Sequence, residues 1–330
     1  MDPSTRSTVP DTPGAGAVLT LAGVTKRYGG TTVVDRLTLS VAPGEMFGLI
    51  GPDGAGKTTT IRLLCGLLHP EAGEVRILGR DPVREHRAVT GEVGYLSQRF
   101  SLYGDLSVDE NVAFFAEIHG VSDYHARRDR LLEMTQLTPF RGRLADRLSG
   151  GMKQKLALAC TLVHRPRIVL LDEPTTGVDP VSRREFWRLL SQFLADGITI
   201  LMSTPYLDEA ERCSRVALLH EGRLLACDDP ARLRAAAQGT WFEVTVPDPQ
   251  GAVAGLRGPG GLAGVQVFGD RVHVRLDERD PERGRRALAE AIVRARIETG
   301  GIRSIVPSLE DVYIARLASG GGTADAEQGS

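Results

Sequence analysis

The feature that most constrains the fold is a glycine-rich stretch at 51–58, which reads GPDGAGKT. It fits the pattern G-x-x-x-x-G-K-[ST], with an apolar run at 46–50 before it and helical spacing of apolar residues at 57–68 after it. Glycines let successive backbone N–H groups converge on phosphate oxygens, and the start of a helix adds its positive end. The pattern therefore predicts a strand, a loop and a helix that together bind a nucleoside triphosphate.

Two side chains of this stretch have predicted roles beyond cradling phosphate. Lys57 is expected to reach the β- and γ-phosphates, and the hydroxyl of Thr58 is expected to ligate Mg²⁺. The cradle is expected to include Gly51, Pro52, Asp53, Gly54, Ala55, Gly56, Lys57, Thr58 and Thr59.

A second apolar run, at 168–171, leads directly into Asp172 and Glu173. A strand that ends in a carboxylate delivers Asp172 to the metal, and the adjacent Glu173 can act as the general base that activates water. An Asp-Glu pair alone could equally form structural ion pairs. Together with the phosphate-binding loop, it indicates hydrolysis of the triphosphate.

The stretch at 148–155, LSGGMKQK, resembles the LSGGQ signature of ATP-binding cassette (ABC) ATPases, with Met152 where glutamine is commonest. It begins 24 residues before Asp172. The resemblance covers about 17–235, and further motifs follow in the family's order. It implies that Tyr28 stacks on adenine, that Gln98 is the catalytic and metal-binding glutamine, and that Asp179 is the acid of the D-loop.

The resemblance also implies the architecture and the cofactors. The expected fold class is α/β, a P-loop NTPase of the ABC type with a mixed sheet, a helical subdomain at about 98–165, and ATP and Mg²⁺ as cofactors. In this family the signature, here Ser149, Gly150 and Gly151, closes over the ATP of a second subunit. One set of motifs therefore implies a homodimer or a heterodimer that closes on ATP and opens after hydrolysis.

One position departs from the family pattern. Pro205 stands where a histidine is expected after the apolar run at 198–202, and proline can neither donate to the γ-phosphate nor take a proton. Three interpretations stay open: slow hydrolysis, pairing with a competent second subunit, or replacement of the histidine by another group such as Thr204. The alternative to a transport ATPase is therefore an ATP-gated regulatory or degenerate subunit with little hydrolysis.

Two further stretches point to export. The stretch at 98–103, QRFSLY, and the stretch at 307–313, PSLEDVY, resemble segments of ATPase subunits that serve ABC-2 type exporters. This likeness implies a separate multispanning ABC-2 membrane permease, with the chain held peripherally at the cytoplasmic face of the membrane. Phe100, Leu102 and Tyr103 are either anchors for that partner or core residues of the helical subdomain. The cargo stays open.

The chain is expected to comprise a disordered lead (1–16), an ABC ATPase domain (17–235), a small α+β domain (240–317) and a disordered tail (318–330). The stretch at 247–264 within the small domain is Gly/Pro-rich, and the expected role of this domain is structural or dimerising. No apolar run is long enough to span a membrane, and no secretory signal is expected.

Composition argues against other classes of function. The formal net charge of −2 gives no global field for nucleic acid, so an ABC ATPase that acts on ribosomes or DNA is disfavoured. The cysteines at 65, 160, 213 and 227 lack the spacing of a zinc site. The acidic run at 208–212 is expected to be a solvated helix face rather than a carboxylate site.

Overall fold

The structure is a computed structural model that describes residues 16–98, 102–257, 262 and 264–320. Phe100 lies outside the described residues, as do all but residue 16 of the expected lead and all but 318–320 of the expected tail. The chain divides into two compact units, Met1–Asp229 and Pro230–Ser330, which are described separately.

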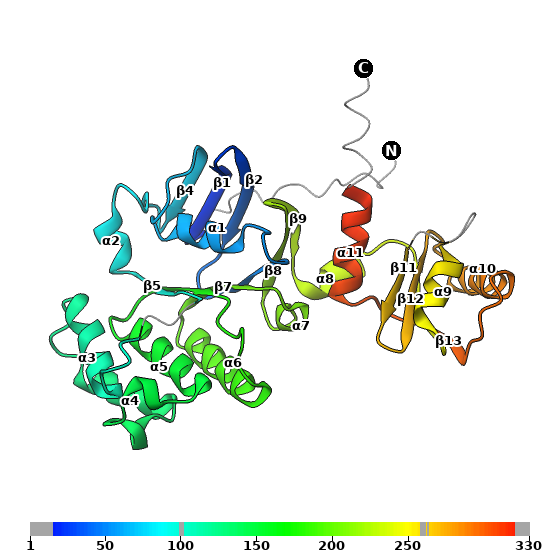
Figure 1. Cartoon of the computed structure of the whole chain (residues 1–330). Helices are drawn as coiled ribbons and strands as arrows, with labels where there is room; N and C mark the ends of the chain where they lie inside the picture. The colour runs from blue at the N-terminus through cyan, green and yellow to red at the C-terminus, as the bar shows by residue number, and fades with distance from the viewer. Residues whose placement is uncertain (1–15, 99–101, 258–261, 263, 321–330) are drawn as a thin grey trace. The chain divides into compact units, whose positions relative to one another are not determined.

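The first unit contains two sheets (Figure 1). A three-stranded antiparallel sheet has the order β2-β1-β4, and a six-stranded sheet has the order β5-β6-β7-β3-β8-β9, in which only β9 is antiparallel to its neighbour. Their bounds are β1 Leu19–Tyr28, β2 Thr31–Val41, β3 Met46–Ile50, β4 Ala72–Ile77, β5 Val93–Leu96, β6 Ile168–Asp172, β7 Thr199–Thr204, β8 Arg215–His220 and β9 Arg223–Asp228. The predicted mixed sheet is thus confirmed.

The sequence explains which strands lie in the middle of the larger sheet. Strands β3, β6 and β7 are buried along their whole length, since each is covered on both faces. Continuous apolar runs are typical of such parallel strands, and all three carry one. Their carboxyl ends bring Ile50, Asp172 and Thr204 to the same edge of the sheet, because the strands are parallel.

Helices pack around this sheet (Figure 1). Their bounds are α1 Lys57–Leu64, α2 His86–Thr90, α3 Val108–Ile118, α4 His125–Met134, α5 Gly150–Leu162, α6 Pro180–Ala195 and α7 Leu207–Ala210, with short 3₁₀ turns at Thr138–Phe140 and Ala145–Arg147. Helix α1 is shorter than the predicted 57–68, because Gly66 adopts a φ of +68° that ends it. Among the described residues, no helix has the length and apolarity needed to cross a membrane.

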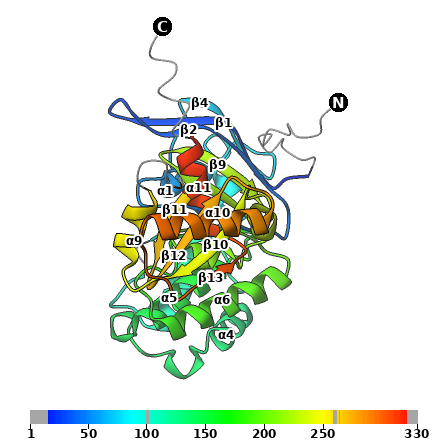
Figure 2. The ribbon, with the colours of Figure 1, turned by 90° about the vertical axis from the view of Figure 1, so that its right-hand side faces the viewer.

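The second unit is built on an antiparallel sheet of order β11-β12-β10-β13 (Figure 2). Its elements are α8 Pro230–Ala235, β10 Thr240–Thr245, α9 Pro249–Leu256, β11 Gly264–Phe268, β12 Arg271–Leu276, α10 Pro281–Arg294, β13 Gly301–Ser304 and α11 Leu309–Gly320. Helix α9 lies inside the Gly/Pro-rich stretch at 247–264, where no helix is predicted from the sequence. Pro249 occupies its first turn and Asp248 accepts a hydrogen bond from the N–H of Gly251, so these residues start a helix instead.

Alternation along the strands decides which face meets which helices. Phe242 and Val244 on β10 and Val272 and Val274 on β12 join the core with α9 and α10. Neighbouring residues such as Trp241, His273 and Arg275 therefore point to the opposite face. That face carries α11, since His273 bonds Asp311 of that helix.

The motif at 307–313 acquires a structural explanation from this contact. The N–H and the hydroxyl of Ser308 donate to Asp311 Oδ2 at 2.8 and 2.7 Å, and the N–H of Asp311 donates to Ser308 Oγ at 3.1 Å. His273 Nδ1 lies 3.0 Å from Asp311 Oδ1, although Asp311 is fully buried. The carboxylate of Asp311 thus stabilises the first turn of α11 and also binds this helix to His273 on β12.

We expect Asp311→Asn to lower the free energy of unfolding by about 1.5–3 kcal/mol near neutral pH, because the bonds to a charged carboxylate are lost. Burial raises the pKa of Asp311, but the hydrogen bonds from His273 and Ser308 outweigh it and hold the pKa below the ordinary 3.8. A lowered folded pKa gives stability that is present above the unfolded value and is lost as pH falls through the folded value. The stability difference between the wild type and Asp311→Asn should therefore shrink below about pH 4.

Thermal unfolding followed by the fluorescence of Trp241, in chains that carry Trp187→Phe, would measure this difference. Asp277→Asn is the control, since Asp277 is an exposed carboxylate on the same unit. A difference between the wild type and Asp311→Asn that stays constant from neutral to acid pH would contradict the assignment.

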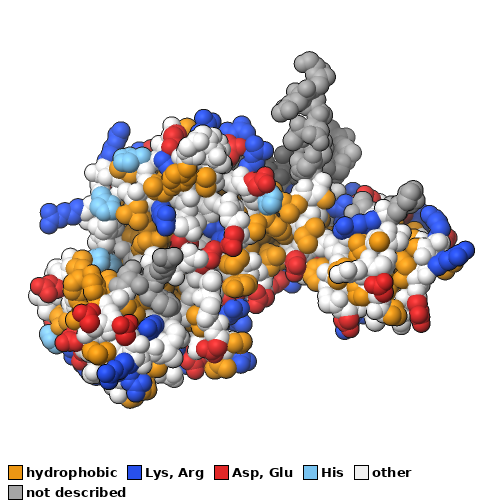
Figure 3. All heavy atoms as spheres, viewed as in Figure 1, with side chains coloured by type: hydrophobic (Ala, Val, Ile, Leu, Met, Phe, Trp, Pro, Cys, Tyr) orange, Lys and Arg blue, Asp and Glu red, His pale blue; other side chains and the backbone are white. Residues whose placement is uncertain are grey.

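Charge is mixed rather than sorted by sign on the face that Figure 3 shows. Figure 3 shows Lys and Arg side chains interspersed with Asp and Glu side chains over the face in view. The face in view thus lacks a separate basic stripe of the kind that binds nucleic acid, among the residues that Figure 3 colours.

Candidate functional site

The glycine-rich loop lies between β3 and α1 and forms one wall of a cavity of about 310 Å³. Gly54 and Gly56 have φ values of +80° and +92°, which only glycine adopts without strain. A Cβ on Gly56 would also lie 2.6 Å from the carbonyl oxygen of Val33. The cavity is lined by Val33, Asp53, Gly54, Ala55, Gly56, Lys57, Thr58, Thr59, Gln98 and Glu173.

Lys57 and Glu173 meet at this cavity although they lie far apart in the sequence. Lys57 Nζ donates to the carbonyl oxygens of Gly51 and Pro52 at 2.8 and 3.0 Å, and it lies 3.1 Å from Glu173 Oε1. Only 4% of Lys57 and 8% of Glu173 is exposed. The ammonium group is therefore oriented by the oxygens beside the loop, and its charge compensates the carboxylate.

Glu173 is held in an uncommon backbone conformation, with a φ of +48°. Its N–H donates to Ser203 Oγ at 3.0 Å, and Gln98 Nε2 donates to Glu173 Oε2 at 3.1 Å. Left-handed backbone at a residue other than glycine is unfavourable and is found at functional sites where neighbours fix it. The strand end, Ser203 and Gln98 together hold this carboxylate at the cavity wall.

Asp172 lies beside Thr58, its partner in the predicted metal site. Thr58 Oγ1 donates to Asp172 Oδ1 at 3.0 Å, and Ser203 Oγ donates to the same oxygen at 2.7 Å. Burial raises the pKa of Asp172, while the two hydroxyl hydrogen bonds act in the opposite direction. A hydroxyl and a carboxylate are oxygen donors of the kind Mg²⁺ prefers, so this pair fits that cation.

Sequence reasoning missed Ser203, which bonds both Asp172 and the backbone of Glu173. The register of β6 and β7 pairs Asp172 with Ser203, so the two polar groups at these strand ends are neighbours. The available signal for Ser203 was its place as the polar residue that follows the run at 198–202.

The acidic run at 208–212 is not a purely solvated face, so that prediction was wrong for Glu209. Only 1% of Glu209 is exposed, and its Oε2 accepts from Thr204 Oγ1 at 2.7 Å and from Thr175 Oγ1 at 2.9 Å. Arg183 Nε lies 3.6 Å from its Oε1. Thr204, the sequence candidate to replace the missing histidine, therefore donates its hydroxyl to Glu209. It does not line the cavity at the phosphate-binding loop.

The signature residues lie at the start of α5. Ser149 caps this helix by accepting from the N–H of Met152 at 3.3 Å, and both Ser149 and Gly150 are exposed. Gly151 is buried, and a Cβ there would lie 2.3 Å from Ser182 Oγ on α6. Asp179 caps α6 by accepting from the N–H groups of Val181 and Ser182 at 3.0 Å.

The structure therefore places the predicted site residues in more than one location. Lys57, Thr58, Asp172, Glu173 and Gln98 converge with the glycine-rich loop. The signature and Asp179 come together at the adjoining starts of α5 and α6, and none of these residues lines the cavity.

Tyr28 and Tyr103 are both exposed. Tyr28 lies at the end of β1, is 44% exposed and has Lys26 Nζ 5.5 Å from its ring centroid, and it does not line the cavity. Tyr103 is 46% exposed and packs edge-on against Phe114, with the ring centroids 4.4 Å apart. Leu102 is half-buried.

Comparisons with known proteins agree with this geometry. The family model described as "ABC transporter" matches residues 34–176. A daunorubicin resistance ATP-binding protein of Streptomyces coeruleorubidus is 35% identical over 91% of this chain and 96% of its own length. A Nod factor export ATP-binding protein of Paraburkholderia xenovorans is 44% identical over 68% of this chain and 76% of its own length.

A probable multidrug ABC transporter ATP-binding protein of Escherichia coli is 48% identical over 70% of this chain, which spans only 41% of that protein. Among solved structures, an ATP-binding subunit of an ABC transporter matches with a TM-score of 0.61 and 31% identity, over 66% of this chain and 92% of its own. The cbiO1 protein of Clostridium perfringens matches with a TM-score of 0.63 and 26% identity, over 67% of this chain and 92% of its own.

Proposed function

The chain belongs to the family of ABC transporter ATP-binding proteins, and from this membership we propose that it hydrolyses ATP to power a membrane exporter. The observation that carries the proposal is the convergence of Lys57, Glu173 and the Thr58–Asp172 pair at one glycine-lined cavity. Nothing in the geometry or the comparisons favours the degenerate, regulatory subunit.

Each residue at the cavity has a task in this chemistry. The N–H groups of the loop and the ammonium of Lys57 bind the β- and γ-phosphates. Glu173 accepts the proton of the attacking water, and Gln98 orients that carboxylate through its 3.1 Å hydrogen bond. Thr58, Asp172 and Gln98 would hold Mg²⁺, which would stabilise the charge on the phosphates.

A second ATPase subunit completes the site. Ser149 and Gly150 are exposed at a helix start, and they do not line the cavity of their own chain. N–H groups at a helix start bind phosphate well, so these residues suit the ATP held by a partner. We place Asp179 at the same interface and Tyr28 against adenine, with either a second copy or a different ATPase chain as the partner.

The membrane partner in this proposal is a multispanning permease of the ABC-2 type, with this chain at its cytoplasmic face. The relatives named for daunorubicin resistance and Nod factor export support it. Tyr103, exposed beside Phe114, and Leu102 are suited to contact that partner. We assign ATP binding to 17–235, including a helical subdomain at about 98–165. The small domain at 240–317 then has a structural or dimerising role.

Gly150 offers a clean test of the dimer. A Cβ at this position meets no atom within 4 Å, so Gly150→Asp leaves the monomer fold intact while placing a negative charge where the partner's phosphates would lie. In a Glu173→Gln background, ATP should drive dimer formation, and Gly150→Asp should abolish it. Light scattering with and without ATP measures the effect, and Gly142→Asp, at another unobstructed glycine, is the control. ATP-driven dimers that persist in Gly150→Asp would contradict the trans arrangement.

The exporter role is tested separately in membranes of cells that express the full chain. The expected result is that a multispanning protein co-purifies with the chain and that its presence raises ATP turnover. A chain that hydrolyses ATP but never associates with membranes would overturn the transport proposal and leave the ATPase assignment standing.

A further inference from the structure

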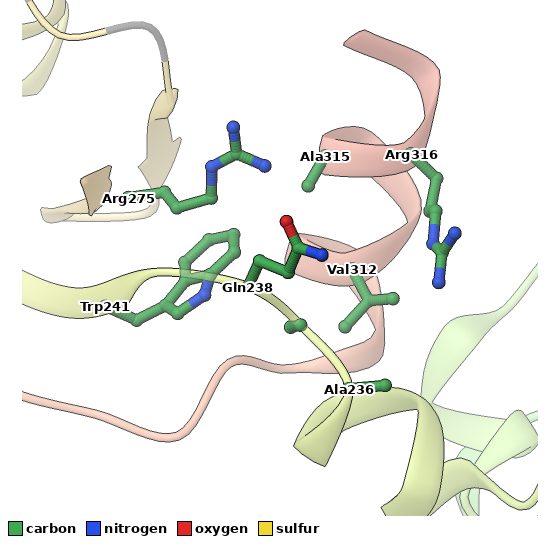
Figure 4. Close-up of a pocket in the computed structure, with 8 residues that line it drawn as sticks. Ala236, Gln238, Trp241, Arg275, Val312, Ala315 and Arg316 are labelled. Atoms are coloured by element: carbon green, nitrogen blue, oxygen red, sulfur yellow. The ribbon is translucent and has the colours of Figure 1, made fainter. Parts of the chain in front are cut away.

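A second pocket, of about 250 Å³, opens within the second unit and shares no residue with the cavity at the phosphate-binding loop (Figure 4). Its walls come from the segment after α8, from β10 and β12, and from α11. The lining residues are Ala236, Ala237, Gln238, Trp241, Arg275, Val312, Ala315 and Arg316.

The fold builds this pocket between one face of a sheet and one face of a helix. Trp241 on β10 is the register partner of Arg275 on β12, so the two side chains stand next to each other on the same face. Val312, Ala315 and Arg316 follow the helical spacing that places residues on one side of α11. Figure 4 shows the side chains of Arg275, Gln238 and Ala315 around the open space.

Most of the polar side chains in this pocket are donors, and Gln238 adds an amide with both a donor and an acceptor. Trp241 is only 4% exposed, and its Nε1–H has no hydrogen-bond partner among the described residues. Figure 4 shows the nitrogen edge of the indole turned toward Gln238 and α11. Buried donors are normally satisfied, so an unpaired indole N–H in a pocket wall indicates a place for an acceptor.

The charge of the lining residues is positive. Arg275 Nη2 lies 3.2 Å from Asp277 Oδ1, but 79% of the Asp277 side chain is exposed, so solvent weakens this pairing. Arg316 forms no ion pair within the described part of the chain, and no carboxylate lines the pocket. Two arginines, Gln238 and an indole N–H therefore line a space whose remaining walls are alanine, valine and the indole ring.

We propose that this pocket binds a small planar carboxylic acid, with an aromatic or heteroaromatic ring. The carboxylate pairs with the guanidinium of Arg275 or Arg316 and accepts from Trp241 Nε1, because guanidinium groups bind carboxylates through two parallel hydrogen bonds. The ring lies against the indole and the apolar side chains of Val312 and Ala315. A volume of about 250 Å³ suits one ring with one acid group.

Binding is measured on the full chain carrying Trp187→Phe, which leaves Trp241 as its tryptophan. Benzoate is the probe. We expect a saturable change in Trp241 fluorescence, with a Kd between about 1 µM and 1 mM, and a weaker effect of the uncharged isostere benzamide. The readout is independent of ATP turnover, so it stands or fails apart from the proposed function.

Matched arginine variants locate the site. Arg275→Ala, Arg316→Ala or both should weaken benzoate binding by about tenfold or more, while Arg286→Ala, at an exposed arginine of α10, should leave it unchanged. Arg316 lies on a helix surface, so its variant keeps the test informative if Arg275→Ala unfolds. No saturable change, or equal affinity in all variants, would overturn the site. Inorganic phosphate that binds as tightly as benzoate would overturn the planar carboxylate as its ligand.

Discussion

Glu173→Gln is expected to reduce ATP hydrolysis by a factor of about 10² to 10⁴ while leaving ATP binding intact. The amide keeps the shape of the side chain and can still meet Gln98, but it cannot accept a proton from the attacking water. Single-turnover release of phosphate from Mg²⁺-ATP, measured beside equilibrium binding of ATP, separates these two effects.

The control for this experiment is Glu290→Gln, at an exposed glutamate on α10, which should behave as the wild type.

The same measurement decides whether the chain hydrolyses ATP although Pro205 replaces the expected histidine. Phosphate release by the wild type that depends on Glu173 shows that hydrolysis proceeds without the histidine. Tight ATP binding with no release from the wild type would contradict the ATPase assignment for the isolated chain.

Lys57→Ala is expected to weaken ATP binding by about 10- to 150-fold, the factor that corresponds to losing a charge-assisted hydrogen bond of about 1.5–3 kcal/mol. Its ammonium is the buried cation that lines the loop cavity, so no neighbouring lysine or arginine of that cavity replaces it. Equilibrium binding of a fluorescent ATP analogue measures the loss. Arg188→Ala, at an exposed cation on α6, should bind as the wild type does.

Lys57 also has an expected effect on stability in the absence of ATP. Removing one partner of a buried ion pair costs about 3–5 kcal/mol, because the other charge stays buried without compensation. The double variant Lys57→Ala with Glu173→Gln should recover part of that loss, since the uncompensated charge is gone. Additive losses in the double variant would show that the 3.1 Å contact is energetically unimportant.

The local parts of the ATP site are predictable from sequence because they are made of neighbouring residues. The apolar strand, the glycines that need positive φ and the helix follow one another directly in the chain. The pattern around 51–58 therefore contains all parts of the phosphate-binding loop. The same holds for a buried strand that ends in Asp172 and Glu173. Helix α9 was not predicted, because its local signal is weak within a Gly/Pro-rich stretch. There the tendency of Asp248 and Pro249 to start a helix outweighs the low helix propensity of the glycines.

The sequence by itself therefore determined the family, the α/β fold class and the residues that we propose to act on ATP. Only the tertiary structure decided which of these side chains meet. Thr58 bonds Asp172 across 114 residues, and Ser203 reaches Asp172 across 31. The bond from Thr175 to the buried Glu209 and the pairing of Trp241 with Arg275 also join segments that are distant in the sequence. The physical reason is that strand register and helix packing are set by the whole core, whereas a sequence pattern reports only the residues next to one another in the chain.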